Sequence, residues 1–111
     1  LKVEQPGGEL MRHLAPLRGD HSTVFASLNS GKRSLVLDLK HQDAVALCKQ
    51  LVTRYDVVVE NFSPGVMTRL GLDYASLREV NPRLVMCSIS GYGQSGPAAT
   101  QPAFAPIVQA E

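Results

Sequence analysis

The apolar residues of this chain are gathered in short blocks, and turn-forming residues separate them. Four blocks predict β-strands: residues 1–4, 34–39, 57–60 and 84–89. Residues 57–59 are an unbroken run of valine, which is typical of a strand covered on both faces. The spacing of these blocks leaves room for a helix between successive strands.

Helical patterns occupy that room. Residues 43–54 carry apolar side chains at helical spacing, with polar residues between them. A short helix is expected over residues 66–70, after the turn at Pro64 and Gly65, and Asp73 suits the N-cap of another helix that runs to residue 79. Strands that alternate with helices predict an α/β fold, a Rossmann-like and mostly parallel sheet with crossover helices.

Residues 9–30 show no such pattern. Histidine, proline, glycine and aspartate are scattered there among few apolar positions, so we interpret the segment as a long irregular connection. A connection of that length inside a compact domain usually has a functional role.

Polar side chains follow two of the predicted strands at the point where each strand ends. Glu60, Asn61 and Phe62 close one strand, and residues 90–93 follow another. Ligands of open parallel sheets bind beyond the carboxyl ends of the strands. The sequence therefore predicts a ligand-binding crevice at this edge, without naming the ligand.

Composition narrows the function classes. The 111 residues are 44% hydrophobic and carry a net charge of +1, which gives no basic field for nucleic acid. No apolar run approaches the roughly 20 residues of a membrane helix, so we expect no membrane association. Cys48 and Cys87 share no spacing with histidine, so we expect no metal site and a reducing compartment, the cytoplasm.

Three motifs carry a resemblance to a known family. They are LNSGKRSLVLDLK (28–40), VVENFSPGVMTRLGL (58–72) and NPRLVMCSISGYGQSGP (81–97). In this order and at these spacings they closely resemble the class III CoA-transferases, a family that includes formyl-CoA and carnitine CoA-transferases and α-methylacyl-CoA racemases. The resemblance implies that residues 1–111 are a partial N-terminal CoA-binding α/β domain of a larger fold, which is an interlaced homodimer.

The resemblance also implies a reaction. In the family, an aspartate attacks an acyl-CoA, forms a mixed anhydride and releases CoA, which then passes to a carboxylic acid acceptor. None of the aspartates of this chain lies in the nucleophile motif, so the nucleophile is expected beyond Glu111 and the 111 residues alone are expected to be inactive.

Five positions match the family's contacts with coenzyme A. Leu37 and Lys40 match residues near the nucleotide, Asn61 and Phe62 match residues beside the CoA chain, and Arg69 matches a cation on the phosphate side. Three of them have a structural alternative: Lys40 as a solvated residue, Phe62 as core, and Arg69 as a charge facing the carboxyl end of its helix.

The substrate pocket is implied to include Gly91, Tyr92, Gly93 and Phe104. Racemase members carry a His-Asp pair where this chain has Phe104 and Ala105, and Phe104 provides neither the base nor the acid that racemisation requires. The transferase is therefore favoured. A racemase-like member, a non-catalytic CoA- or nucleotide-binding module and an interaction protein without a small ligand are the alternatives.

Overall fold

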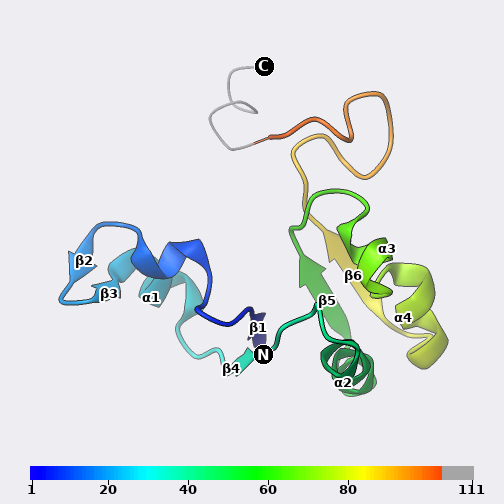
Figure 1. Cartoon of the computed structure of the whole chain (residues 1–111), viewed down its shortest axis with the longest axis horizontal. Helices are drawn as coiled ribbons and strands as arrows, with labels where there is room; N and C mark the ends of the chain where they lie inside the picture. Colours follow the sequence, from blue (N-terminus) through cyan, green and yellow to red (C-terminus); the bar gives the residue numbers. More distant parts are fainter. Residues whose placement is uncertain (104–111) are drawn as a thin grey trace. The chain divides into compact units, whose positions relative to one another are not determined.

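The computed structural model describes residues 1–103 of the chain, and these residues form two compact units (Figure 1). The first unit comprises Leu1–Ala44 and the second begins at Val45. The predicted mixture of helices and parallel strands is confirmed.

The first unit is built on a parallel pair of strands. β1 (Lys2–Glu4) lies beside β4 (Ser34–Val36), with Lys2 opposite Ser34 and Glu4 opposite Val36. Leu37, just after β4, donates its backbone N–H to the carbonyl oxygen of Glu4 at 2.8 Å, which extends the ladder by one bond. β1 begins one residue later than the predicted strand 1–4, and β4 ends three residues earlier than the predicted strand 34–39.

The segment that connects these strands is structured, so the prediction of an irregular connection over residues 9–30 is wrong. It contains a 3-10 helix, a small hairpin and a helix: η1 (Leu10–His13), β2 (Leu17–Arg18), β3 (His21–Ser22) and α1 (Thr23–Asn29). Gly19, with φ near +60°, occupies the hairpin turn. Ser22 caps α1 by accepting the Phe25 N–H at 3.2 Å.

The second unit contains another parallel pair and the helices around it. α2 (Gln42–Val52) leads into β5 (Val57–Glu60), and two short helices, α3 (Val66–Leu70) and α4 (Tyr74–Val80), connect β5 to β6 (Val85–Ser88). The predicted strands and helices of this half are all present, with ends that shift by at most two residues. Asp73 caps α4 as expected, since its carboxylate accepts the Ser76 N–H at 2.8 Å.

A small apolar core holds the second unit together. Its larger buried side chains come from α2, α4 and the connections around α4, and the small Ala99 joins them from the chain after β6: Val45, Val52, Leu72, Leu77, Leu84 and Ala99. Leu77 is the most enclosed of them, at 1% exposure. The side chains buried in the first unit are instead polar, Glu4 and Ser22. An apolar core therefore stabilises the second unit and not the first.

The sheet differs from the prediction in two respects. The four strands form two separate parallel pairs, and the hairpin adds a small antiparallel pair, instead of one continuous sheet. Helices cover only one face of the β5–β6 pair among the described residues. Val57, Val59 and Val85 on the other face are each more than half exposed, so coverage of both faces is not observed.

Candidate functional site

The carboxyl ends of β5 and β6 meet at one edge because the two strands run parallel. Glu60, the last residue of β5, lies opposite Ser88, the last residue of β6. The Ile89 N–H donates to the Glu60 carbonyl oxygen at 2.9 Å, just beyond the last pair. The turn after β5 and the loop after β6 therefore leave the sheet side by side.

The turn after β5 is organised by the side chain of Glu60. One carboxylate oxygen of this buried residue accepts the Phe62 N–H at 2.8 Å. The turn then closes with the Val66 N–H donating to the Ser63 carbonyl oxygen at 3.1 Å. Gly65, at φ near +83°, precedes α3 in a left-handed conformation that favours glycine. The chain therefore bends directly after β5, and the side chain of Glu60, the last residue of that strand, holds the bend.

Three of the predicted CoA contacts belong to this turn and to α3. Asn61 is exposed, and Phe62 keeps 43% of its surface exposed, so Phe62 is not an ordinary core residue. Arg69 is also exposed, and its guanidinium forms no ion pair with any residue of the described range 1–103.

Arg69 does not face the carboxyl end of α3. One of its terminal nitrogens lies 3.5 Å from the place where a Cβ on Gly65 would stand, so the side chain folds back toward the start of the helix. The carboxyl end is closed by Gly71, at φ near +67°, whose N–H donates to the carbonyl oxygens of Met67 and Thr68. The structural alternative for Arg69 is therefore not what the structure shows.

The loop after β6 contains the other predicted positions. Gly93 has φ near +82°, which a side chain rarely tolerates, whereas Gly91 is exposed and Tyr92 is half-buried. The Gln94 amide donates to the Ser90 hydroxyl at 3.3 Å across this loop. Phe104 lies outside the described residues.

Leu37 and Lys40 belong to the first unit. Leu37 is half-buried directly after β4, and Lys40 is exposed in the turn that precedes α2. The backbone N–H of Lys40 donates to the Asp38 carboxylate at 3.0 Å, which fixes the turn, and the Lys40 ammonium forms no ion pair within residues 1–103.

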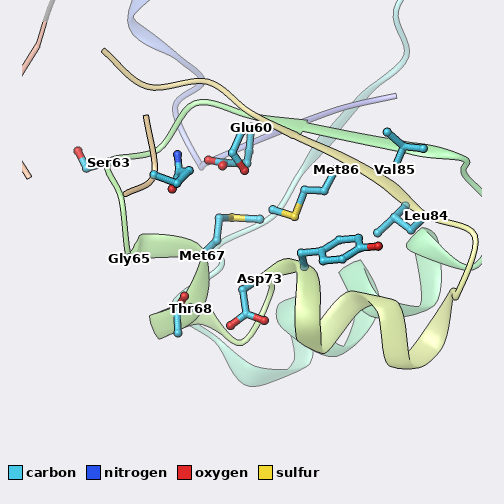
Figure 2. Close-up of a pocket in the computed structure, with 12 residues that line it drawn as sticks. Glu60, Ser63, Gly65, Met67, Thr68, Asp73, Leu84, Val85 and Met86 are labelled. Carbon is cyan, nitrogen blue, oxygen red and sulfur yellow. The ribbon is translucent and has the colours of Figure 1, made fainter. Parts of the chain in front are cut away.

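A pocket of about 630 Å³ lies in the second unit, on the face of β5 and β6 that the helices cover (Figure 2). Its walls include Glu60, Met67, Asp73, Met86 and Gln94, and none of the predicted CoA contacts lines it. The N–H of Ser76 lowers the pKa of the Asp73 carboxyl, which keeps that group ionised. A pocket with two carboxylates repels phosphate groups, so it is unsuited to the phosphates of a nucleotide.

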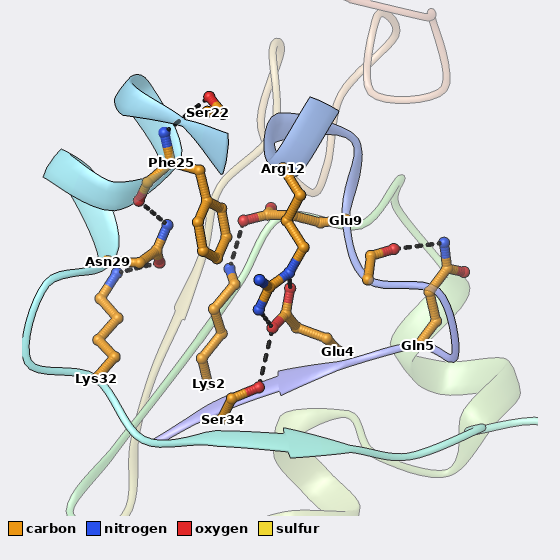
Figure 3. Close-up of polar contacts among 11 residues, drawn as sticks. Lys2, Glu4, Gln5, Glu9, Arg12, Ser22, Phe25, Asn29, Lys32 and Ser34 are labelled. Atoms are coloured by element: carbon orange, nitrogen blue, oxygen red, sulfur yellow. Dashed lines mark hydrogen bonds and ion pairs between the residues drawn. The ribbon is translucent and has the colours of Figure 1, made fainter. Parts of the chain in front are cut away.

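A polar cluster in the first unit holds β1, β4 and η1 together (Figure 3). The buried Glu4 carboxylate accepts two hydrogen bonds from Arg12, at 3.0 and 2.6 Å, and one from the Ser34 hydroxyl at 3.1 Å. The guanidinium of Arg12 in turn stacks over the Phe25 ring, 4.1 Å from its centre. Hydrogen bonding by Arg12, with a smaller contribution from Ser34, lowers the pKa of Glu4 to about 2 against the opposing effect of burial.

The sequence places Glu60 at the edge of the predicted crevice but predicts no chemical role for it, and it predicts no role for Glu4. For Glu60, the available signal was an acidic residue at the end of an apolar strand, which indicates that it accepts backbone bonds in a turn. For Glu4 and Arg12, which are eight residues apart, no spacing signal exists. Within the range 1–103 the structure contains no cluster of three or more metal-ligating side chains, and no helix there is long and apolar enough to cross a membrane.

Comparison with known proteins gives one consistent result. The model of CoA-transferase family III matches residues 1–111. An acetyl-CoA:oxalate CoA-transferase of Acetobacter aceti is 48% identical over 99% of this chain and 28% of its own length. A succinate–glutarate CoA-transferase of Agrobacterium fabrum is 43% identical over 98% of this chain and 29% of its own length.

Comparison of the fold with solved structures points to the same family as comparison of the sequence. The crystal structure of a CAIB/BAIF family protein from Brucella suis superimposes with a TM-score of 0.89 and 37% identity, over 97% of this chain and 30% of the other. The chain thus spans a little over a quarter of the length of the relatives that it matches.

Proposed function

This chain belongs to CoA-transferase family III, and from that premise we propose that it is the N-terminal, CoA-binding part of an enzyme that transfers CoA from an acyl-CoA to a carboxylic acid. The match of the family model to all 111 residues carries this proposal. The names of two relatives, an acetyl-CoA:oxalate and a succinate–glutarate CoA-transferase, support carboxylic acids as the acceptor class.

The grip on CoA is assigned to the edge described above and to the turn after β4. Asn61 bonds polar groups of the pantetheine arm, Phe62 covers its apolar stretch and Arg69 attracts a phosphate. Leu37 and Lys40 contact the nucleotide, and the loop with Gly91, Tyr92 and Gly93 borders the acyl group. The exposure of Asn61, Phe62 and Arg69 supports this assignment, since these side chains are available to a ligand.

The chemistry is assigned to chain outside these residues. An aspartate there attacks the thioester carbonyl, the carbon–sulfur bond breaks and CoA leaves as a thiolate, which is covalent catalysis through an acyl anhydride. The complete enzyme is proposed to be a cytoplasmic, interlaced homodimer, whose Rossmann-like, mostly parallel sheet is completed by chain outside these residues. The 111 residues alone are then inactive.

The racemase alternative requires a base and an acid at the α-carbon. The sequence has Phe104 and Ala105 where racemases carry His-Asp, and neither residue moves a proton. A non-catalytic CoA-binding module shares the same grip and differs only in lacking turnover.

The proposal is tested with the full-length protein and two ligands, CoA and pantetheine, which lacks the nucleotide and its phosphates. A ligand at about 100 times its Kd stabilises the folded state by about 2.7 kcal/mol, so CoA is expected to raise the thermal midpoint. Arg69→Ala is expected to weaken CoA binding by about threefold to tenfold and to leave pantetheine binding unchanged. Arg78→Ala, which removes an exposed arginine on α4, is the matched control.

Acyl-CoA turnover with a carboxylic acid then separates the enzyme from the non-catalytic module. A wild-type protein that neither binds CoA nor is stabilised by it would contradict the proposal. Equal losses in Arg69→Ala and Arg78→Ala would remove the assigned role of Arg69.

A further inference from the structure

We propose that Glu60 is a positioning residue for CoA binding: its carboxylate holds the backbone of the turn so that Asn61 and Phe62 present their side chains to the ligand. This inference rests on the proposed function and extends it to a residue that does not itself contact CoA.

The Glu60 carboxylate is bonded to the backbone of the turn that follows β5. Glu60 is only 9% exposed and is the last residue of β5. Just beyond the end of β5, the Phe62 N–H donates to the Glu60 carboxylate at 2.8 Å. A charged acceptor makes a hydrogen bond roughly twice as strong as a neutral one. The carboxylate therefore fixes the backbone between Asn61 and Phe62.

The side chain of Glu60 lies on a different side of the turn from the proposed ligand contacts. Its side chain lines the pocket on the covered face, near Met67 and Met86 (Figure 2), whereas Asn61 and Phe62 are exposed and do not line that pocket. Glu60 thus supports the turn from behind. A carboxylate that faced the phosphates of CoA would repel them, and this placement avoids that cost.

Glu60 bonds to both segments of this edge, the turn after β5 and the loop after β6. The carbonyl oxygen of Glu60 accepts the Ile89 N–H at 2.9 Å while its side chain holds Phe62. One residue therefore sets the start of both the turn after β5 and the loop that carries Gly91 and Gly93. A shift of the Glu60 backbone moves both loops together.

The test uses the full-length enzyme with Glu60→Ala and Glu60→Gln, and Glu79→Ala as the control at an exposed position of α4. Three quantities are measured: hydrogen exchange at the Phe62 amide, the Kd for CoA, and kcat and KM for acyl-CoA. Loss of a bond to a charged acceptor is expected to raise Kd and KM by about tenfold in Glu60→Ala. An amide oxygen still accepts, so Glu60→Gln is expected to show a rise of about threefold, with kcat unchanged in both.

A purely structural role predicts a different pattern. It lowers the folded fraction, so the apparent kcat falls while KM and the Kd of the folded molecules stay constant. That result in Glu60→Ala, or wild-type exchange at Phe62, overturns the inference. If Glu60→Ala does not fold, Glu60→Gln decides alone, and wild-type exchange and KM in that variant overturn it.

The outcome for the wild type separates the two proposals. A wild-type enzyme that fails to bind CoA overturns the proposed function and the ligand role of Glu60 together. A wild-type enzyme that binds CoA, with Glu60→Ala unchanged in KM, overturns only the role of Glu60.

Discussion

Asn81 joins three elements of the second unit through one half-buried side chain. Its amide nitrogen donates to the carbonyl oxygens of Val52 and Tyr55, each at 3.0 Å, and its amide oxygen accepts the Arg83 N–H at 3.2 Å. Val52 is the last residue of α2, whereas Asn81 follows α4 and Arg83 leads into β6. The side chain thus satisfies carbonyl groups that the end of α2 leaves open.

The expected cost of removing it follows from these bonds. A hydrogen bond between neutral groups contributes about 0.5–1.5 kcal/mol net, and water replaces part of that at a half-exposed site. Asn81→Ala is therefore expected to lower the free energy of unfolding by about 2 kcal/mol. Asn81→Asp keeps the acceptor for Arg83 but sets an anion against two carbonyl oxygens at the negative end of a helix. We expect the aspartate to cost about 3 kcal/mol, more than alanine does.

The assay is the denaturation midpoint of the full-length protein, measured side by side for the variants. One kcal/mol shifts the thermal midpoint by about 2–4 °C in a domain of 150–250 residues and by less in a larger protein. Asn61→Ala is the control, because Asn61 is exposed and makes no hydrogen bond through its side chain within residues 1–103. The reasoning is refuted if Asn81→Asp is as stable as Asn81→Ala, or if Asn81→Ala matches the wild type.

Two further predictions concern the first unit and the chain on its own. The pKa of Glu4 is lowered to about 2 from 4.5, so the contribution of its carboxylate to stability is complete above about pH 5 and disappears as the pH falls toward 2. The difference in thermal midpoint between the wild-type full-length protein and Glu4→Gln should therefore become smaller as the pH falls through that window. A difference that stays constant with pH would contradict this. Within residues 1–103 the structure exposes Val57, Val59 and Val85 and leaves strand edges unpaired, so we expect the isolated 111 residues to self-associate and to show no turnover. Sedimentation as a monomer with a sharp cooperative melt would contradict this.

The elements of the second unit could be predicted because each is encoded locally. A run of three valines ending in Glu60 indicates a strand, apolar residues at helical spacing indicate α2, and Asp73 three residues before Ser76 indicates a cap. Each of these signals spans no more than about a dozen residues, so no knowledge of the tertiary structure is needed to recognise it.

The strands β1 and β4 of the first unit were predicted, but the segment between them could not be, because its arrangement depends on distant polar contacts. Arg12 reaches Glu4 across eight residues and Ser34 reaches it across thirty, and neither separation has a characteristic pattern. Within that segment only α1 left a usable signal, with Ser22 before apolar residues at Val24, Phe25 and Leu28. The exposed face of β5 also departs from the prediction of a strand that is covered on both faces. A run of valines indicates a strand, but it does not indicate which residues cover each face.

The two parallel pairs share one feature at the carboxyl end of their first strand. Glu4 and Glu60 are each the last residue of the first strand, and each is buried, at 6% and 9% exposure. The carbonyl oxygen of each accepts the N–H of the residue just after the partner strand, at 2.8 Å from Leu37 and 2.9 Å from Ile89.

The two carboxylates differ in what they bind, and the difference matters for function. The Glu4 carboxylate is neutralised by Arg12, so it anchors η1 and makes no bond to the turn that follows β4, where the Asp38 carboxylate accepts the Lys40 N–H. Glu60 binds a backbone N–H instead, and so it controls the turn that carries Asn61 and Phe62. Loss of the Glu4 carboxylate should then act mainly on stability, whereas loss of the Glu60 carboxylate should act mainly on KM, because only the second shapes backbone that is proposed to touch the ligand.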